Sequence, residues 1–140
     1  MTFREKMHWA SLLAILAGFG WYFAMLLAAG GDASGLHDYF AGLLVLVIGG
    51  LIVVMTFAAI VMAIAAPSEA SASVDERDAQ IHMRGTFYAY YTLVVGIWGI
   101  GLAAHFGFGL FIILNAALGL LVLCETIRIG VQIYLYRRGY

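Results

Sequence analysis

The sequence predicts an all-α integral membrane protein, folded as a four-helix bundle made of two antiparallel helical hairpins. Three observations lead to this fold class: four long apolar segments, few charged residues, and basic residues confined to alternate connections. Apolar residues make up 64% of the 140 residues, and charged residues only 11%. So few polar side chains do not cover the surface of a water-soluble domain, which favours a chain that lies in lipid.

The four apolar segments are long enough to cross a membrane. They run from Trp9 to Ala29, from Tyr39 to Ala66, from Phe87 to Ala104 and from Leu110 to about Leu123. A helix needs about 20 apolar residues to span the hydrocarbon core. The third segment reaches this length with its polar ends included. The fourth regains apolar character after the charges near its end, which predicts a long helix that leaves the membrane.

The placement of the basic residues orients these spans. Residues 30–38 and 104–109 contain no Lys or Arg, whereas the other connection and both ends of the chain do. Cytoplasmic segments are enriched in basic residues. We therefore expect a multi-pass membrane protein, with the N-terminus, the middle connection and the C-terminus in the cytoplasm. The seven basic residues are Arg4, Lys6, Arg77, Arg84, Arg128, Arg137 and Arg138.

A polar connector divides the chain into two hairpins, expected at residues 1–66 and 74–140, with the connector at 67–73. Pro67 is the only proline, and a helix does not continue easily through proline, so the second helix should end at or just before Ala66. The run from Ser73 to Glu76 matches a capping box. It predicts a third helix that begins near Val74, in the cytoplasm, and continues to about Ala104.

The third and fourth helices are predicted to protrude together into the cytoplasm as a stalk. Their tight connection at residues 105–109 makes them an antiparallel pair, in which Glu125 lies opposite Tyr88 and within reach of Arg84. Arg128 lies one turn along from Glu125 on the same helix, and a second ion pair is expected there.

The same register places Arg137 and Arg138 opposite Asp75 and Glu76, and we expect ion pairs between the two helices. Exposed pairs of this type contribute about 0–1 kcal/mol each, so they set register more than stability. The complete set of expected stalk and interaction residues is Asp75, Glu76, Arg77, Asp78, Arg84, Glu125, Arg128, Arg137 and Arg138.

Two polar residues of the fourth helix suggest a transporter or channel as the alternative function. Asn115 lies within its apolar segment, and Glu125 follows it. Polar residues inside a membrane often mark a pathway for ions or substrates. The alternative is a purely structural role: an ion pair at the membrane boundary for Glu125 and an interhelical hydrogen bond for Asn115. No acidic residue occupies the middle of a span, which argues against ion-coupled transport.

The four histidines suggest a third, weaker alternative, a di-haem electron carrier. His8 and His82 are predicted on the cytoplasmic side, and His37 and His105 on the outer side. Each pair joins two hairpins, and neutral imidazoles on facing helices are suitable ligands for haem b. None lies well inside an apolar segment, which argues against a shielded haem. No other metal site is predicted, since Asp78 and His82 alone do not make one.

Composition excludes several further classes of function. The net charge is −1 and no run of Lys and Arg is present, so nucleic acid is not an expected partner. The apolar segments carry no constellation of nucleophile, base and acid, so an enzyme is not predicted. Small residues recur at Ala10, Ala14 and Gly18, which favours close helix packing within the chain or in a homo-oligomer.

The leading hypothesis is therefore a non-catalytic accessory or interaction protein of the inner membrane. Its partners would be the lipid bilayer and either a second copy of the chain or another membrane protein.

Two segments resemble a family of small bacterial membrane proteins with four spans. The first is Asp75-Glu76-Arg77-Asp78-Ala79-Gln80-Ile81, followed by the aromatic run from Phe87 to Tyr91, and the second is the opening from Thr2 to Lys6 ahead of Trp9. The resemblance covers mainly residues 2–22 and 75–95. It implies a helix bundle of unknown activity in the bacterial inner membrane. Some members of the family accompany small helix-turn-helix regulators. It implies no active site.

The predicted orientation is testable with reporter fusions. Alkaline phosphatase requires the periplasm and green fluorescent protein the cytoplasm, so fusions at either terminus should give fluorescence and no phosphatase activity. A phosphatase fusion within residues 30–38 should be active. A periplasmic location of either terminus contradicts the orientation, because it would place the basic residues on the wrong side.

Overall fold

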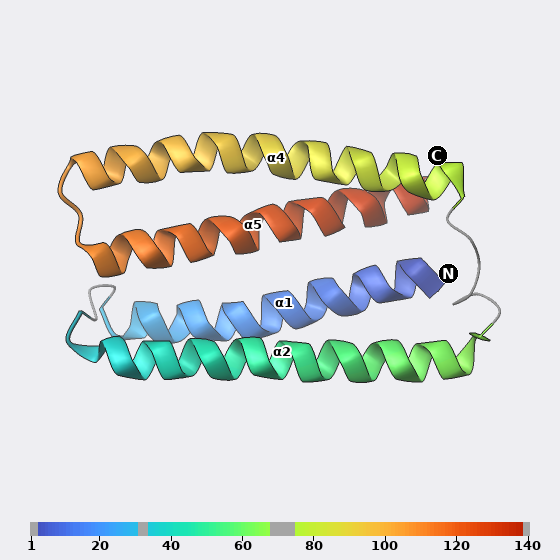
Figure 1. Ribbon diagram of the computed structural model, residues 1–140, viewed down its shortest axis with the longest axis horizontal. Helices are drawn as coiled ribbons and strands as arrows, with labels where there is room; N and C mark the ends of the chain where they lie inside the picture. The colour runs from blue at the N-terminus through green and yellow to red at the C-terminus, as the bar shows by residue number, and fades with distance from the viewer. Residues whose placement is uncertain (1–2, 31–33, 68–74, 139–140) are drawn as a thin grey trace.

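A computed structural model describes residues 3–30, 34–67 and 75–138 of the chain. These residues form four long α-helices and one short 3-10 turn (Figure 1). The chain runs up and down as two antiparallel hairpins, α1–α2 and α4–α5, which confirms the predicted fold class. The elements are α1 (Phe3–Ala28), η1 (Ser34–Leu36), α2 (His37–Ala65), α4 (Glu76–His105) and α5 (Leu110–Arg137).

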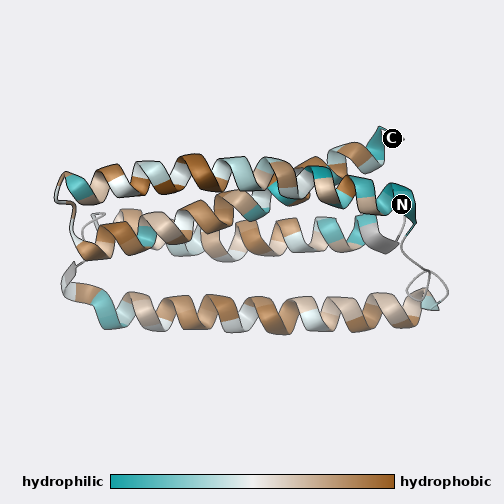
Figure 2. Ribbon diagram, turned by 45° about the horizontal axis from the view of Figure 1, so that its top comes forward, coloured by the Kyte–Doolittle hydropathy of each residue, from teal (hydrophilic) through white to brown (hydrophobic). Residues whose placement is uncertain are grey.

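All four helices are long and apolar enough to cross a membrane, and the chain is a multi-pass membrane protein. The start of α1, the end of α2, the start of α4 and the end of α5 lie at the same end of the bundle, here called the terminal end (Figure 1). The opposite end, with the two hairpin turns, is called the turn end. Hydrophilic residues gather at the terminal end of α1, α4 and α5 (Figure 2).

The helices are arranged in the order α2, α1, α5, α4, and each packs mainly on its neighbour in this order. The two inner helices therefore have a partner on each side, whereas α2 and α4 have one main partner each. Lipid replaces the missing neighbours, since an apolar helix surface is as stable against hydrocarbon as against protein. This open arrangement exposes a long face of α4.

An aromatic cluster near the turn end joins the first hairpin to α5. Tyr22 of α1, Phe40 of α2 and Phe111 of α5 are all buried. The ring centroids of Phe40 lie 6.0 Å from Tyr22 and 5.9 Å from Phe111, both in edge-on geometry. Edge-on contacts between aromatic rings are favourable. The cluster is extended by Leu26, Leu43 and Val47.

The α4–α5 hairpin is held by a second interface toward the terminal end. Ile81 of α4 is 1% exposed, and Ile129 and Ile133 of α5 are also buried. Two glycines of α4 allow the close approach: a Cβ atom at Gly85 would lie 2.8 Å from the backbone oxygen of Arg128, and one at Gly96 would overlap the Leu120 side chain. Small residues at such contacts are typical of helix pairs in lipid.

The helix boundaries match the predictions with one difference. Helix α2 ends at Ala65, as expected ahead of Pro67. Helix α4 begins at Glu76, and its N-cap is Asp75, whose carboxylate accepts a hydrogen bond from the Glu76 amide at 2.7 Å. The predicted capping box placed Ser73 in that role and the helix start at Val74. Both residues lie outside the described part of the chain, but the N-cap position belongs to Asp75.

The turn between α4 and α5 is a glycine-terminated Schellman motif. Gly107 has a φ of 80°, a left-handed conformation that side chains other than glycine adopt only at a cost. The Phe108 amide donates to the Ala103 carbonyl at 3.2 Å, and the Gly107 amide donates to Ala104 at 3.1 Å. These two bonds satisfy carbonyls at the helix end, and they reverse the chain tightly, as predicted.

The predicted register of α4 against α5 is confirmed, but the predicted protruding stalk is not a separate structure. Position 82 faces 132, and position 78 faces 136, as the turn implies. The four helices have 26, 29, 30 and 28 residues, and they run beside one another over their length (Figure 1). Helix α2, at about 45 Å, is as long as α4, so α4 and α5 do not extend alone.

Replacing Gly85 with Ala should weaken the α4–α5 interface by about 1–3 kcal/mol, because the added methyl group meets a backbone atom that has no room to move. The measurement is equilibrium unfolding in a graded mixture of mild detergent and dodecyl sulfate, followed by circular dichroism. Gly99→Ala on the same helix is the control: its Cβ would meet nothing within 4 Å, and no loss is expected. Equal effects of the two changes would contradict the packing described here.

Candidate functional site

A groove lies at the terminal end of the bundle, between α1, α4 and α5. Its volume is about 930 Å³, and its walls are mainly apolar. We call it the terminal groove. The residues that line it are His8, Asp78, Ala79, Ile81, His82, Met83, Thr86, Phe87, Tyr90, Gln132 and Tyr136.

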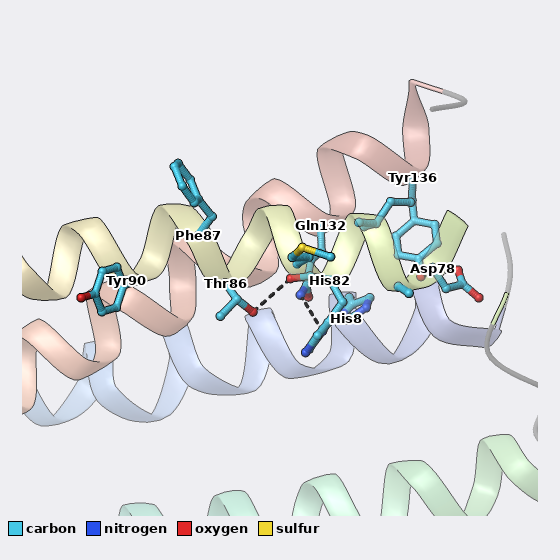
Figure 3. Close-up of a pocket in the computed structure, with 11 residues that line it drawn as sticks. His8, Asp78, His82, Thr86, Phe87, Tyr90, Gln132 and Tyr136 are labelled. Atoms are coloured by element: carbon cyan, nitrogen blue, oxygen red, sulfur yellow. Dashed lines mark hydrogen bonds between the residues drawn. The ribbon is translucent and has the colours of Figure 1, made fainter. Parts of the chain in front are cut away.

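A hydrogen bond joins two of the residues that line the groove, His82 of α4 and Gln132 of α5 (Figure 3). Gln132 Nε2 lies 3.1 Å from His82 Nδ1, and Gln132 is only 1% exposed. A buried amide is stable only when it has a partner. With the amide donating to Nδ1, the neutral imidazole carries its hydrogen on Nε2. Gly85 makes this bond possible, because a side chain at position 85 would occupy the space that the Gln132 side chain fills against α4.

A second polar contact lies one helical turn closer to the terminal end. The Tyr136 hydroxyl of α5 donates to Asp78 Oδ1 of α4 at 2.6 Å. The His8 ring of α1 lies with its centroid 5.8 Å from that of Tyr136. Three helices thus contribute to one polar cluster, and Figure 3 shows Asp78 and Tyr136 on one side of His8 and His82.

The other side of the groove is aromatic. Phe87 and Tyr90 line it from α4, and Figure 3 places both on the side away from Asp78. Phe87 is 56% exposed, and its ring lies 4.6 Å from that of Tyr91. The lining of the groove is therefore amphipathic, with polar groups at one end and aromatic rings at the other.

The predicted haem ligands are only partly brought together. His8 and His82 line the same groove, and both belong to its polar cluster. His37 packs on Phe111 at 4.9 Å, and His105 lies beside Phe106 at 5.9 Å. In the described segments, no ring contact joins His37 to His105. In the same segments, no group of three or more His, Cys, Asp and Glu side chains is placed to hold a metal ion.

Asn115 and Glu125, the predicted transport residues, occupy separate places. Asn115 Oδ1 accepts a hydrogen bond from the Tyr22 hydroxyl at 2.7 Å, and its amide donates to the Phe111 carbonyl at 2.9 Å. The bond to Tyr22 joins α5 to α1 and confirms the structural role that was expected for Asn115. Glu125 Oε2 is bonded to Arg128 at 2.6 Å. The Glu125–Arg128 pair is confirmed as well.

The predicted ion pair between Glu125 and Arg84 is not formed: among the described residues, Glu125 pairs with Arg128. Arg84 lies instead in a smaller hollow with Tyr134 and Leu135 of α5, about two turns from Glu125. The reason is that Arg128 reaches Glu125 from the same helix with two hydrogen bonds, through Nε at 3.0 Å and through a terminal guanidinium nitrogen at 2.6 Å. A partner on the same helix needs no precise register between helices.

The predicted ion pairs of Arg137 and Arg138 with Asp75 and Glu76 are also not formed among the described residues. The Arg137 guanidinium lies over the Trp9 ring at 5.9 Å, and that of Arg138 over the Tyr134 ring at 5.0 Å. The end of α5 faces α1 through Trp9, and a cation over an aromatic face is favourable. The arginines therefore contact aromatic rings while the carboxylates of Asp75 and Glu76 remain exposed.

Sequence reasoning missed Gln132 and Tyr136 as members of a site. Both are polar residues in an apolar stretch, and they lie four residues apart, as do Asp78 and His82. Residues at this spacing share one face of a helix, so two such pairs on antiparallel helices indicate a polar seam. The signal was present in the sequence, but it is seen only when both helices are considered in register.

Comparison with known proteins gives no assignment for this site: no protein family, curated protein or solved structure matches the chain.

A double-mutant cycle tests the polar seam. His82→Leu and Gln132→Leu should each destabilise the fold, and the double variant should recover part of the loss, with a coupling free energy of about 0.5–1.5 kcal/mol. The readout is the same equilibrium unfolding in detergent. His105→Leu combined with Gln132→Leu is the control pair, and its effects should add. A zero coupling for His82 and Gln132 would contradict their hydrogen bond.

Proposed function

We propose that the protein is a non-catalytic interaction protein of the bacterial inner membrane, with its terminal end in the cytoplasm. It would hold a protein partner, another membrane protein or a second copy of the chain, through the charged residues of that end. One observation supports this role most directly. Asp75, Glu76, Arg77, Arg137 and Arg138 are exposed, and within the described segments no ion pair joins these residues to one another.

The arrangement of these charges favours a specific partner over simple solvation. Acidic residues lie at the start of α4, and basic residues lie at the end of α5, which is its neighbour. Charges of opposite sign on adjacent helices form a pattern that a complementary surface matches in one orientation. Such patterns determine specificity and association rate more than affinity, so binding should weaken with salt.

The geometry gives less support to the alternatives. A transporter that uses Asn115 and Glu125 would need both in one pathway, whereas Asn115 is bonded to Tyr22 and Glu125 to Arg128. A di-haem carrier would need two paired sites, whereas His37 and His105 contact different aromatic rings. The resemblance of residues 75–95 to a family of small bacterial membrane proteins agrees with the accessory role that we propose.

Site-specific photo-crosslinking in native membranes tests the proposal. A photoreactive amino acid at Arg77 or Arg137 should give one discrete protein adduct, because these side chains lie in the expected interface. Reversing the charge of Glu76 and Arg138 together should reduce the adduct severalfold, since each exposed charge contributes up to about 1 kcal/mol. The measurement is adduct yield on a denaturing gel, with the partner identified by mass spectrometry.

The matched control is the same probe at Phe106, which is 75% exposed at the turn end and should give no protein adduct. An adduct pattern that is identical at Arg77 and Phe106, or adducts with lipid only, would contradict the proposed interface. An adduct of twice the chain mass would identify the partner as a second copy.

A further inference from the structure

We propose that a hollow at the turn end of the bundle, between α1, α2 and α5, binds an ammonium group carried on a small apolar body. We call it the turn-end hollow. Its volume is about 280 Å³, near the lower limit of sites that bind small molecules. The carboxylate of Asp38 lines it together with aromatic and aliphatic side chains. The hollow is separate from the charged surface that is proposed to hold a protein partner, and it does not depend on that proposal.

The charge of this part of the chain favours a cation. Residues 21–66 and 98–123 include both hairpin turns, and their charged residues are Asp32 and Asp38, with no Lys or Arg. Residues 31–33 lie outside the described part of the chain, but they are Gly, Asp and Ala and add no positive charge. An anionic ligand would therefore meet a carboxylate and no basic side chain, which is unfavourable. An ammonium group would meet its countercharge.

The other charges on the neighbouring helices do not reverse this sign. Arg128 follows Asn115 on α5 by 13 residues, and Lys6 precedes Tyr22 on α1 by 16, which correspond to about 20 Å and 24 Å of helix. Helix dipoles act from nearer, with about half a unit charge at each helix end. Because α2 and α5 begin at the turn end and α1 ends there, the dipoles leave about half a positive charge. This is less than the full negative charge of Asp38.

Aromatic rings provide a second attraction for a cation. Tyr22, Phe40 and Phe111 line the hollow from three different helices. The His37 ring also lines it, and its centroid lies 4.9 Å from that of Phe111. Aromatic faces attract cations, most strongly where water is excluded. An organic ammonium suits this lining better than a metal ion, which needs more oxygen ligands than the hollow supplies.

The remaining side chains of the hollow determine the size of the apolar body. Leu44 lies six residues beyond Asp38 on α2, which is about 9 Å of helix, the length of one substituted benzene ring. Leu114 lines the hollow from α5. The polar groups between these walls are already used, since the Tyr22 hydroxyl donates to Asn115 at 2.7 Å. The interior therefore accepts an apolar body, and the charge of the ligand is recognised at Asp38.

Fluorine NMR of the full-length protein in dodecyl maltoside micelles, at pH 8, tests the proposal. The probe is 4-(trifluoromethyl)benzyltrimethylammonium, and its titration should saturate relative to empty micelles. The neutral isostere, in which carbon replaces nitrogen, should bind about fivefold more weakly, the factor expected for one exposed charge contact. The sulfonate of the same ring should not bind. Equal binding of the neutral isostere would overturn the role of charge, and a titration that does not saturate, or binding of the sulfonate, would overturn the site.

Two sources can supply the ammonium group: a free amine, or the headgroup of phosphatidylethanolamine. Short-chain phosphatidylethanolamine and phosphatidylglycerol, added as competitors of the probe, distinguish them. Displacement by phosphatidylethanolamine alone supports the proposal and assigns the hollow to a lipid headgroup. Displacement by neither lipid supports it with a free amine as the ligand. Equal displacement by phosphatidylglycerol, which has no amine, would overturn the proposed chemistry.

Variants connect the binding to the residues. Asp38→Asn removes the carboxylate and should raise the dissociation constant of the probe about fivefold. Ala41→Phe fills the hollow from an exposed position of α2 and should abolish saturable binding. The matched controls at the terminal end, Glu76→Gln and Ala65→Phe, make the same changes at exposed positions and should stay within about twofold. Unchanged binding in Ala41→Phe, with native circular dichroism, would overturn the location of the site.

Discussion

The structure depends on one constraint: hydrocarbon offers no hydrogen bonds, so each polar group within it must find a partner in the protein. The backbone meets this condition by forming helices. The side chains meet it in pairs, as Tyr22 with Asn115 and Gln132 with His82. Each pair joins two helices, so polar satisfaction and helix association are the same event. Glycines at 85 and 96 then permit the approach that makes the α4–α5 pair close.

Much of the fold follows from this constraint, and for that reason it was predictable from sequence. Segment length, the single proline and the glycine after Phe106 all act locally, and the helix bounds agree with expectation to within two residues. The register of α4 on α5 follows from a short turn. The order of the helices across the bundle was not predictable. Apolar faces are nearly equivalent in lipid, so the choice of α5 as the neighbour of α1 depends on rings such as Tyr22, Phe40 and Phe111.

The errors in the site have a common physical cause. Sequence reasoning paired each charge with the nearest opposite charge across the hairpin, but long side chains choose among all neighbours. Arg137 and Arg138 found the aromatic rings of Trp9 and Tyr134, and Glu125 found Arg128 on its own helix. The neutral residue Asn115 behaved more predictably, since its amide has few possible partners, and it bonds to Tyr22 of α1. Gln132 was overlooked because a single glutamine in an apolar stretch carries no motif.

The terminal groove exists because the helices cannot close into a compact bundle without burying polar side chains in an apolar interior. Helix α4 must keep Gln132 bonded to His82, which holds it against α5, and α2 must keep its own long apolar face on α1. A closed bundle would bring α4 onto the first hairpin and would bury Asp78, Thr86 and His8 in an apolar interior. Burial of a carboxylate in an apolar interior costs more free energy than its contact with lipid headgroups and water. The open side of α4 is therefore a consequence of where the polar residues lie, and it leaves the terminal groove between α1, α4 and α5.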